Sequence, residues 1–159
     1  MVDSEVMNNI PNRLRQGAHT TYDLWYHFVW IPKYRRSVLT GATRDYLHER
    51  LLERCQLLEL EIDSMAIEPD HVHLFLGAPP RWRPADIAYH LKKATGQELM
   101  AEFPALRHQF WQGALWARGY FVSTVGEDRV SDQIRAYIHK QGQLAPREPV
   151  RQSDQLSLF

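Results

Sequence analysis

The chain has 159 residues, the length of one ordinary domain with its own hydrophobic core, and its 44% hydrophobic and 24% charged residues are typical of a globular protein without a membrane span. Nineteen Lys and Arg residues balance nineteen Asp and Glu residues, so the net charge does not indicate a nucleic-acid-binding protein, and only local basic patches remain for that role. A single cysteine, Cys55, excludes an internal disulfide and a Cys-x-x-Cys zinc site, so a metal ion would need His, Asp, Glu or Gln ligands.

Polar segments at both ends predict tails around one folded domain. Residues 1–21 mix Asn, Pro, Arg and Gly without periodicity, and residues 143–159 carry two prolines in a polar run. We therefore expect the folded domain over residues 22–142. The first residues have neither a basic start nor an apolar run, so we expect a cytoplasmic protein.

The central residues predict alternating strands and helices. An aromatic and β-branched run predicts a strand over 24–30. Apolar residues at three- and four-residue spacing predict an amphipathic helix over 43–60, with Leu52, Cys55 and Leu57 on its buried face. Two strand-like runs, 61–68 and 71–78, are joined through Pro69-Asp70 and predict an antiparallel hairpin.

The second half of the domain continues the alternation. Asp86 is a candidate cap for a helix over 87–103, which we expect to stop at Pro104. A strand over 115–125 follows, and then a helix that begins near Asp128 or Ser131 and ends at Gly142. The order β-α-β-β-α-β-α predicts an α+β, ferredoxin-like (RRM-like) split βαβ sandwich with an antiparallel sheet and one extra carboxy-terminal helix.

Two histidines alternate with a valine at the start of the second hairpin strand. Because successive side chains of a strand point to opposite faces, His71 and His73 share one face while Val72 points to the other. Two imidazoles on one face suit a shared metal ion. An arbitrary His-x-His pair in a strand is, however, more often hydrogen-bonded on the sheet surface.

The last predicted helix carries Tyr137 and Gln141 four residues apart and therefore on one face. A half-buried tyrosine beside an exposed glutamine is commonplace. Together with the strand histidines, this pair supplies two neutral nitrogens, an amide oxygen and a phenolic nucleophile. That combination is much rarer than its parts.

Four motifs follow one another along the chain: YHFVWIPKYRR at 26–36, EPDHVHL at 68–74, LWARGYFV at 115–122 and YIHKQ at 137–141. In this order and spacing the chain resembles the TnpA-type single-tyrosine transposases of small insertion sequences, over about residues 26–141. It departs from many relatives at Ala114, where they carry a histidine, and at His139-Lys140, where they carry Glu-Asn.

The resemblance implies a ferredoxin-like HUH nuclease, named for histidine, bulky hydrophobic residue, histidine. His71 and His73 match the metal-binding pair, Gln141 the third ligand and Tyr137 the nucleophile, with Mg²⁺ or Mn²⁺ as the cation. The implied activity is cleavage and rejoining of single-stranded DNA through a 5′-phosphotyrosine intermediate, for excision and integration of an insertion sequence with hairpin-bearing ends. The resemblance also implies a homodimer whose active sites are completed in trans.

Basic residues lie in two places that fit DNA binding, where aromatic residues also occur. The candidates are Lys33, Arg35 and Arg36 after the first predicted strand, and Arg83, Lys92 and Lys93 around the start of the second predicted helix. Tyr34 and Trp82 are candidate stacking surfaces, since single-strand binding commonly combines cations with aromatic rings. An ordinary solvated surface is the alternative.

The last residues resemble the short peptide by which many bacterial proteins dock on the β sliding clamp. Leu156, Leu158 and Phe159 would fill an apolar pocket and Gln155 would make a polar anchor. An apolar terminus that packs on its own domain or on a dimer partner is the alternative.

Three other functions remain open from the sequence. One is a domesticated, repeat-associated tyrosine nuclease on the same scaffold, and another is a noncatalytic single-stranded nucleic-acid-binding module. The complete set of His71, His73, Tyr137 and Gln141 argues against binding alone. The third is a zinc hydrolase that uses the two histidines and a water nucleophile. We expect His27 and His90 to be structural or surface residues.

Overall fold

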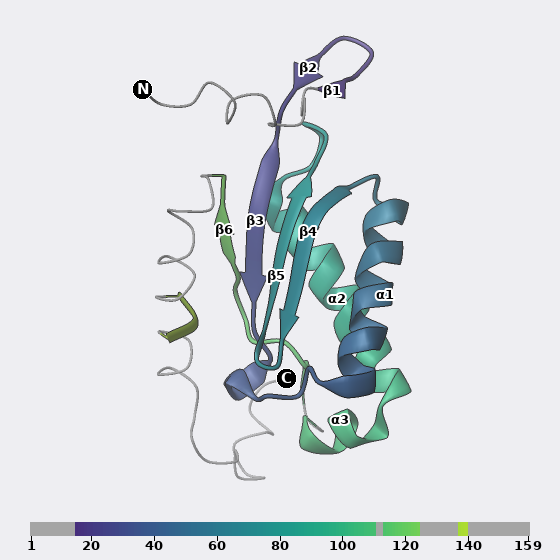
Figure 1. Cartoon of the computed structure of the whole chain (residues 1–159), viewed down its shortest axis with the longest axis vertical. Coiled ribbons are helices and arrows are strands. Elements are labelled where there is room, and N and C mark those ends of the chain that lie inside the picture. Colours follow the sequence, from purple (N-terminus) through teal and green to yellow (C-terminus); the bar gives the residue numbers. More distant parts are fainter. Residues whose placement is uncertain (1–14, 111–112, 125–136, 140–159) are drawn as a thin grey trace, which may run out of the picture.

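A four-stranded sheet with helices on one face forms the centre of the computed structural model, which describes residues 15–110, 113–124 and 137–139 (Figure 1). The strands are β3 (Trp25–Trp30), β4 (Glu61–Glu68), β5 (His71–Gly77) and β6 (Phe121–Ser123), arranged in the order β4-β5-β3-β6. All three neighbouring pairs are antiparallel. This is the strand order of a split βαβ sandwich, so the predicted α+β, ferredoxin-like fold is confirmed.

The main hydrophobic core lies between the sheet and two helices, α1 (Gly41–Leu57) and α2 (Pro84–Glu102). Alternate residues of the two central strands face this core and are buried: Tyr26, Phe28, Trp30, Val72, Leu74 and Leu76. Because strand side chains alternate, the intervening residues of β3 and β5 lie on the opposite face. We call this opposite face, which α1 and α2 do not cover, the open face.

The β4–β5 hairpin has the predicted turn at Pro69-Asp70, and its strands match the predicted bounds to within one residue. In its register His73 pairs with Ala66 and His71 with Glu68. On the other side, β3 places Val29 opposite His73. The first predicted strand, 24–30, is likewise confirmed. Strand β3 begins one residue later than predicted and ends at the predicted residue.

Helix α1 is shorter than predicted at its end. It stops at Leu57, where Leu58 caps it, and Glu59 takes a left-handed φ of 58° that turns the chain toward β4. The expectation that Leu52 and Leu57 lie on the apolar, buried face is wrong, because their side chains are 44% and 66% exposed, whereas Cys55 is buried as predicted. The buried residues of this helix are Leu47, Leu51 and Cys55, which follow one another at four-residue spacing.

The start of α2 also differs from the prediction. Arg83 is the N-cap and Pro84 the first helical residue, so Asp86 lies in the first turn and pairs with Arg83 rather than capping the helix. The helix ends at Glu102, but Pro104 begins a short further helix, α3 (Pro104–Gln109), where the sequence pattern predicts none. A proline fits the first turn of a helix as well as it ends one.

The predicted strand over 115–125 is too long. Of the described residues in this range, Phe121–Ser123 alone pair as a strand with β3, and Trp116 makes an isolated bridge to Pro32. Between them, the Lys92 ammonium donates hydrogen bonds to the carbonyls of Ala117 and Gly119 at 2.8 and 2.6 Å. The Lys92 side chain therefore binds backbone carbonyls of Ala117 and Gly119, where the sequence predicts hydrogen bonds to a neighbouring strand.

Two short elements lie outside the predicted ones. Strands β1 (Arg15–Gln16) and β2 (Thr21–Tyr22) pair into a small hairpin at one end of the sheet, within and next to the segment predicted as a tail (Figure 1). A 3-10 turn, η2 (Lys33–Arg35), follows β3. Residues 1–14 and 143–159, and the predicted last helix apart from a helical turn at 137–139, lie outside the described residues. No described helix is long and apolar enough to cross a membrane.

Candidate active site on the open face of the sheet

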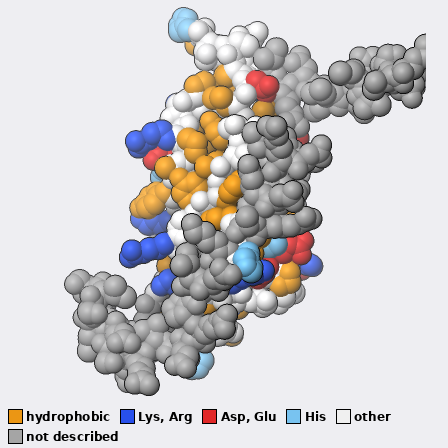
Figure 2. Space-filling view, turned by 90° about the vertical axis from the view of Figure 1, so that its left-hand side faces the viewer, with side chains coloured by type: hydrophobic (Ala, Val, Ile, Leu, Met, Phe, Trp, Pro, Cys, Tyr) orange, Lys and Arg blue, Asp and Glu red, His pale blue; other side chains and the backbone are white. Residues whose placement is uncertain are grey.

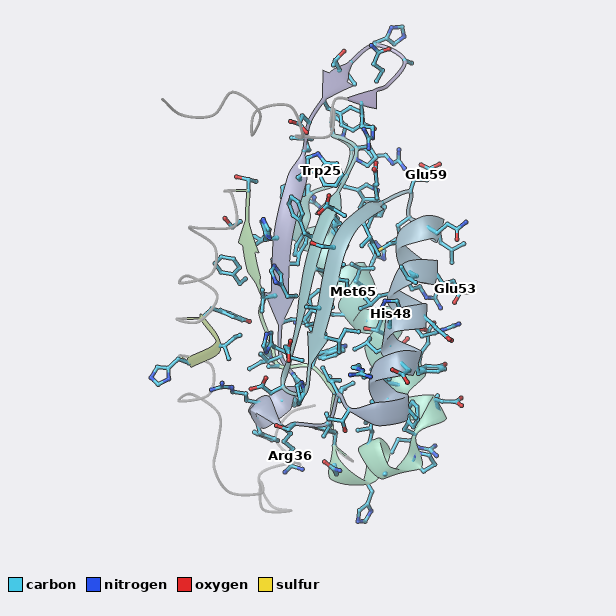
Figure 3. All side chains as sticks on the ribbon, in the orientation of Figure 1. Trp25, Arg36, His48, Glu53, Glu59 and Met65 are labelled. Carbon is cyan, nitrogen blue, oxygen red and sulfur yellow. The ribbon has the colours of Figure 1, made fainter. Side chains whose placement is uncertain are left out.

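The predicted histidine pair lies on the open face. His71 and His73 are half-buried, whereas Val72 between them is fully buried in the core on the other side. The predicted sharing of one face is therefore confirmed. The pair stands where β5 begins, at the end of the sheet that also carries the η2 turn and Arg36 (Figures 1 and 3).

His71 is held by a carboxylate that is held in turn by an arginine. Asp70 Oδ1 lies 2.9 Å from His71 Nδ1, and Asp70 Oδ2 lies 2.8 Å from Arg35 Nε. An ionised carboxylate only accepts hydrogen bonds, so Nδ1 of His71 carries the proton. Burial alone would raise the pKa of the Asp70 carboxyl, but the hydrogen bonds from His71 and Arg35 outweigh it and leave this pKa below its ordinary value.

His73 contacts a second, buried histidine. Nδ1 of His27, whose side chain is only 2% exposed, lies 3.2 Å from Nε2 of His73. The His27 ring stacks on Phe75 with the ring centroids 4.1 Å apart and an interplanar angle of 14°. His27 is thus a structural residue, as expected, but one that directly supports the orientation of His73.

Tyr137 lies on the same open face, on the far side of β3 from His73. It packs with Ile138 against Val29, Ile31 and Phe121, and its ring centroid is 6.1 Å from that of Phe121. The Tyr137 hydroxyl is buried and has no hydrogen-bond partner among the described residues, and burial raises its pKa to about 12. The tyrosine therefore rests here as a neutral phenol.

The two histidines suit a divalent cation, for which they provide nitrogen donors on one face. The Asp70 carboxylate behind His71 is the kind of outer partner that metal-ligating histidines commonly have. Within residues 15–110, 113–124 and 137–139, no group of three or more His, Cys, Asp and Glu side chains could hold a metal ion. The described residues therefore fit as part of a ligand set, and Gln141, the third predicted ligand, lies outside them.

The first cluster of predicted DNA-binding residues surrounds the η2 turn. The Arg36 guanidinium lies 5.4 Å from the ring centroids of both Tyr34 and Phe110, at the end of the sheet opposite Trp25 (Figure 3). Lys33 lies against Gly113, where a Cβ atom would come within 2.6 Å of its Nζ. Arg35 is the member of this cluster that pairs with Asp70.

The second cluster lies on α2, in the helical layer behind the sheet. Arg83 is exposed and pairs with Asp86, and Lys93 lies 5.4 Å over the Tyr89 ring. Lys92 is half-buried between its two carbonyl partners, and burial lowers the pKa of its ammonium group to about 8. The Trp82 indole donates a hydrogen bond to the Leu58 carbonyl and packs against the core.

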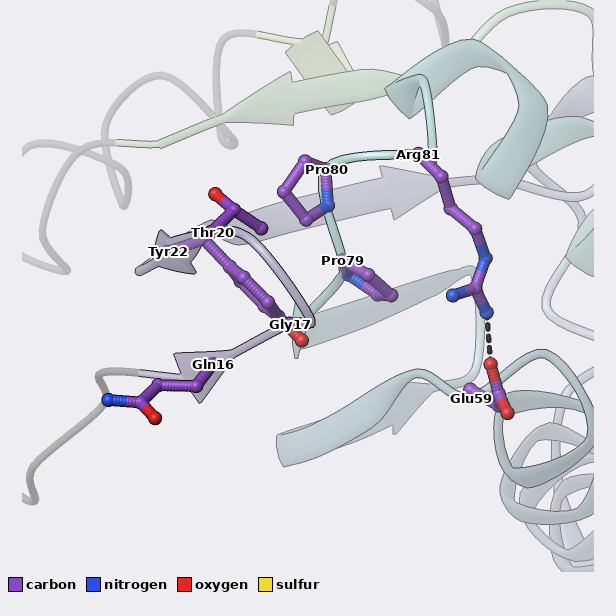
Figure 4. Close-up of a pocket in the computed structure, with 8 residues that line it drawn as sticks. All are labelled: Gln16, Gly17, Thr20, Tyr22, Glu59, Pro79, Pro80 and Arg81. Carbon is purple, nitrogen blue, oxygen red and sulfur yellow. Dashed lines mark hydrogen bonds and ion pairs between the residues drawn. The ribbon is translucent and has the colours of Figure 1, made fainter.

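Two cavities lined by described residues lie away from the histidine pair. One of about 460 Å³, lined by Tyr22, Pro79, Pro80 and Arg81 among others, opens beside the β1–β2 hairpin at the other end of the sheet (Figure 4). A smaller one of about 300 Å³ lies between α2 and residues 113–116.

On the side of the molecule that carries β6, hydrophobic side chains form much of the described surface, with Lys and Arg side chains along one margin (Figure 2).

The supporting partners of the two histidines, Asp70 and His27, are not predicted as site residues from the sequence. Asp70 was interpreted as a turn residue only, and His27 as a residue without a site role. A carboxylate directly before a His-x-His strand pair was a usable signal. The contact between His27 and His73 depends on strand register and had no signal in the sequence. The predicted docking peptide, Gln155, Leu156, Leu158 and Phe159, lies outside the described residues.

Comparisons with known proteins identify the family. The family model described as "Transposase IS200 like" matches residues 20–141. The ISDra2 transposase TnpA of Deinococcus radiodurans is 36% identical over 132 residues, which cover 83% of this chain and 94% of that protein. The transposase for insertion sequence element IS200 of Salmonella typhimurium is 31% identical over 120 residues, which cover 74% of this chain and 79% of that one.

A solved structure agrees with the sequence comparisons. The crystal structure of a Deinococcus radiodurans R1 protein assigned as a candidate transposase aligns with a TM-score of 0.75 at 36% identity, over 80% of this chain and 97% of that chain. Both the fold and the sequence over most of the chain therefore agree with one group of proteins. The chain belongs to the IS200-like transposase family.

Proposed function

We propose that this transposase-family protein cuts and rejoins single-stranded DNA at the ends of an insertion sequence, with Tyr137 as the nucleophile. The observation that carries the proposal is the placement of His71, His73 and Tyr137 on one face of the sheet. The relatives named as insertion-sequence transposases support the mobile-element reading over a domesticated nuclease.

In the proposed reaction His71 and His73 would hold a divalent cation, Mg²⁺ or Mn²⁺, together with Gln141. The cation would polarise the scissile phosphate and favour the ionised form of the attacking phenol. Asp70 keeps the proton of His71 on Nδ1, which leaves the Nε2 lone pair to bind.

Tyr137 attacks the phosphorus atom through its phenolic oxygen. The Oη–P bond forms as the bond from phosphorus to the 3′ oxygen breaks, and the phenolic proton is transferred, directly or through solvent, to the released 3′ oxygen. The products are a 5′-phosphotyrosine link and a free 3′-hydroxyl. Since the phosphotyrosine keeps the energy of the phosphodiester, another 3′-hydroxyl can reverse the step and join new strands without ATP.

The resting position of Tyr137 supports a mechanism in which its helix moves. The hydroxyl is buried in an apolar patch, without a partner in the described part of the chain, so it must leave that patch or be uncovered before it meets a phosphate. Completion of the site in trans by a second copy of the chain fits this requirement and is part of the proposal.

The test is a denaturing-gel assay with labelled single-stranded DNA that carries the element's own ends. We expect wild type to form a protein–DNA adduct that requires Mn²⁺ or Mg²⁺, and we expect Tyr137→Phe and His71→Ala to form none. Tyr89→Phe is the matched control, because Tyr89 is exposed on α2, and it should form the adduct normally. An adduct retained by Tyr137→Phe, or binding without any adduct in wild type, would sink the proposal.

A further inference from the structure

Arg35 is attached to the candidate active site through a continuous chain of polar contacts. Its Nε lies 2.8 Å from Asp70 Oδ2, and the other oxygen of the same carboxylate lies 2.9 Å from His71 Nδ1. The arginine and the histidine thus occupy opposite sides of one carboxylate. The Arg35 side chain is 39% exposed, whereas the Asp70 side chain is 23% exposed, so the carboxylate is the more shielded member of the pair.

The backbone around Arg35 adopts an unfavourable conformation. Tyr34 and Arg35 are consecutive non-glycine residues with φ of 62° and 50°, in the left-handed region. Backbone hydrogen bonds hold this turn from both sides, from Lys33 N to the Leu115 carbonyl at 2.8 Å and from Arg35 N to the Pro32 carbonyl at 3.0 Å. Such strain persists only where the surrounding structure maintains it, and it is commonly found at functional sites.

The neighbouring arginine has different surroundings. Arg36 lies over the rings of Tyr34 and Phe110, and its Nη1 is 3.4 Å from the Gln109 carbonyl. It does not contact Asp70 or His71 in these interactions. The two adjacent arginines therefore allow a direct comparison. Arg35 contacts Asp70, the hydrogen-bond partner of His71, whereas the Arg36 contacts given above involve Tyr34, Phe110 and Gln109.

We propose that Arg35 is a positioning residue for His71, acting through Asp70, rather than a contact to DNA. By fixing Asp70, it sets the orientation of the imidazole and keeps the proton on Nδ1, so that Nε2 faces outward as a ligand. The inference rests on the proposed function in taking His71 as a metal ligand. It replaces the sequence-based assignment of Arg35 to DNA binding.

The first test follows the proton of His71 in the metal-free protein. Nitrogen-15 NMR of labelled histidine rings should show His71 as the Nδ1–H tautomer in wild type. We expect a mixture of tautomers in Arg35→Gln and in Asp70→Asn, and the wild-type signal in Arg36→Gln. An unchanged tautomer in Arg35→Gln would overturn the proposal, and this readout does not depend on metal or on DNA cleavage.

The second test measures Mn²⁺ binding by calorimetry without DNA. We expect Arg35→Gln to raise the dissociation constant about 10-fold to 100-fold, the effect usually seen when an outer partner of a metal ligand is lost. Arg36→Gln should bind Mn²⁺ as wild type does. Because Arg35 acts through Asp70, the double variant should bind no more weakly than Asp70→Asn alone. Arg35→Lys, which keeps a cation beside Asp70, should recover part of the affinity.

A third measurement separates positioning from DNA contact. Binding of single-stranded DNA in the presence of EDTA is measured at several salt concentrations, and we expect Arg35→Gln to keep the wild-type salt dependence. A salt slope reduced by about 0.7, with unchanged Mn²⁺ affinity, would make Arg35 a phosphate contact and refute the proposal. A wild-type protein with the expected tautomer and Mn²⁺ responses but no DNA adduct would refute the proposed function and leave this inference standing.

Discussion

Replacing the candidate nucleophile should make the protein more stable. The Tyr137 hydroxyl is buried and finds no hydrogen-bond partner within residues 15–110, 113–124 and 137–139, and a buried, unsatisfied polar group costs about 1–3 kcal/mol. Tyr137→Phe removes the hydroxyl and keeps the ring against Phe121. We therefore expect a gain of about 1 kcal/mol in the free energy of unfolding and a rise of roughly 2–4 °C in Tm. Urea and thermal unfolding of metal-free protein measure both.

Ile138 provides the matched control for this prediction. Its side chain is 7% exposed and packs on Val29 and Ile31, so Ile138→Ala should lose about 2–5 kcal/mol if the tyrosine helix is docked in solution as it is here. A loss of 1 kcal/mol or more in Tyr137→Phe would refute the reasoning, because it would mean that the hydroxyl has a partner. A neutral Ile138→Ala would refute the docked position itself.

Two further predictions concern buried groups outside the site. Burial raises the pKa of the Cys55 thiol from 9.0 to about 12, so the folded state holds this proton more tightly than the unfolded state. The free energy of unfolding should therefore fall as the pH rises from about 9 toward 12. Urea unfolding should show a smaller fall in Cys55→Ala than in wild type over this range. An equal fall in the variant would count against the burial of the thiol. Lys92→Met should lose about 1–3 kcal/mol of stability, because two carbonyls lose their donor, and keep the salt dependence of DNA binding, whereas Lys93→Met should reduce that dependence. Unfolding curves and salt titrations check both variants, and a reduced salt slope in Lys92→Met with unchanged stability would contradict this assignment.

The parts of the fold set by local pattern could be predicted from the sequence. The hairpin over 61–77 follows from two strand-like runs around Pro69-Asp70, and the shared face of His71 and His73 follows from strand geometry alone. The placement of Tyr137 on that face could not be derived from spacing, since it depends on how a distant helix packs against Val29 and Phe121.

The errors arise where tertiary contacts overrule local pattern. The strand expected over 115–125 is mostly irregular, because Lys92 on another element satisfies the carbonyls of this segment. Leu52 fits an amphipathic helix by spacing, but the sheet and α2 cover only the row of Leu47 and Leu51. Arg35 looked like its neighbour Arg36 in the sequence, and only a turn with two left-handed residues separates their surroundings.

The central strand β3 has consequences for how the chain folds during synthesis. It is made early, and its partner on one side, β5, lies about 45 residues later, while β6 on the other side lies nearly 100 residues later. Until residues 121–123 leave the ribosome, one edge of an aromatic-rich strand has unpaired backbone groups, which are prone to pair with other chains. Closure of this sheet therefore depends on contacts distant in sequence, which form slowly. The face on which the reaction is proposed to occur is complete only when nearly the whole domain has been made.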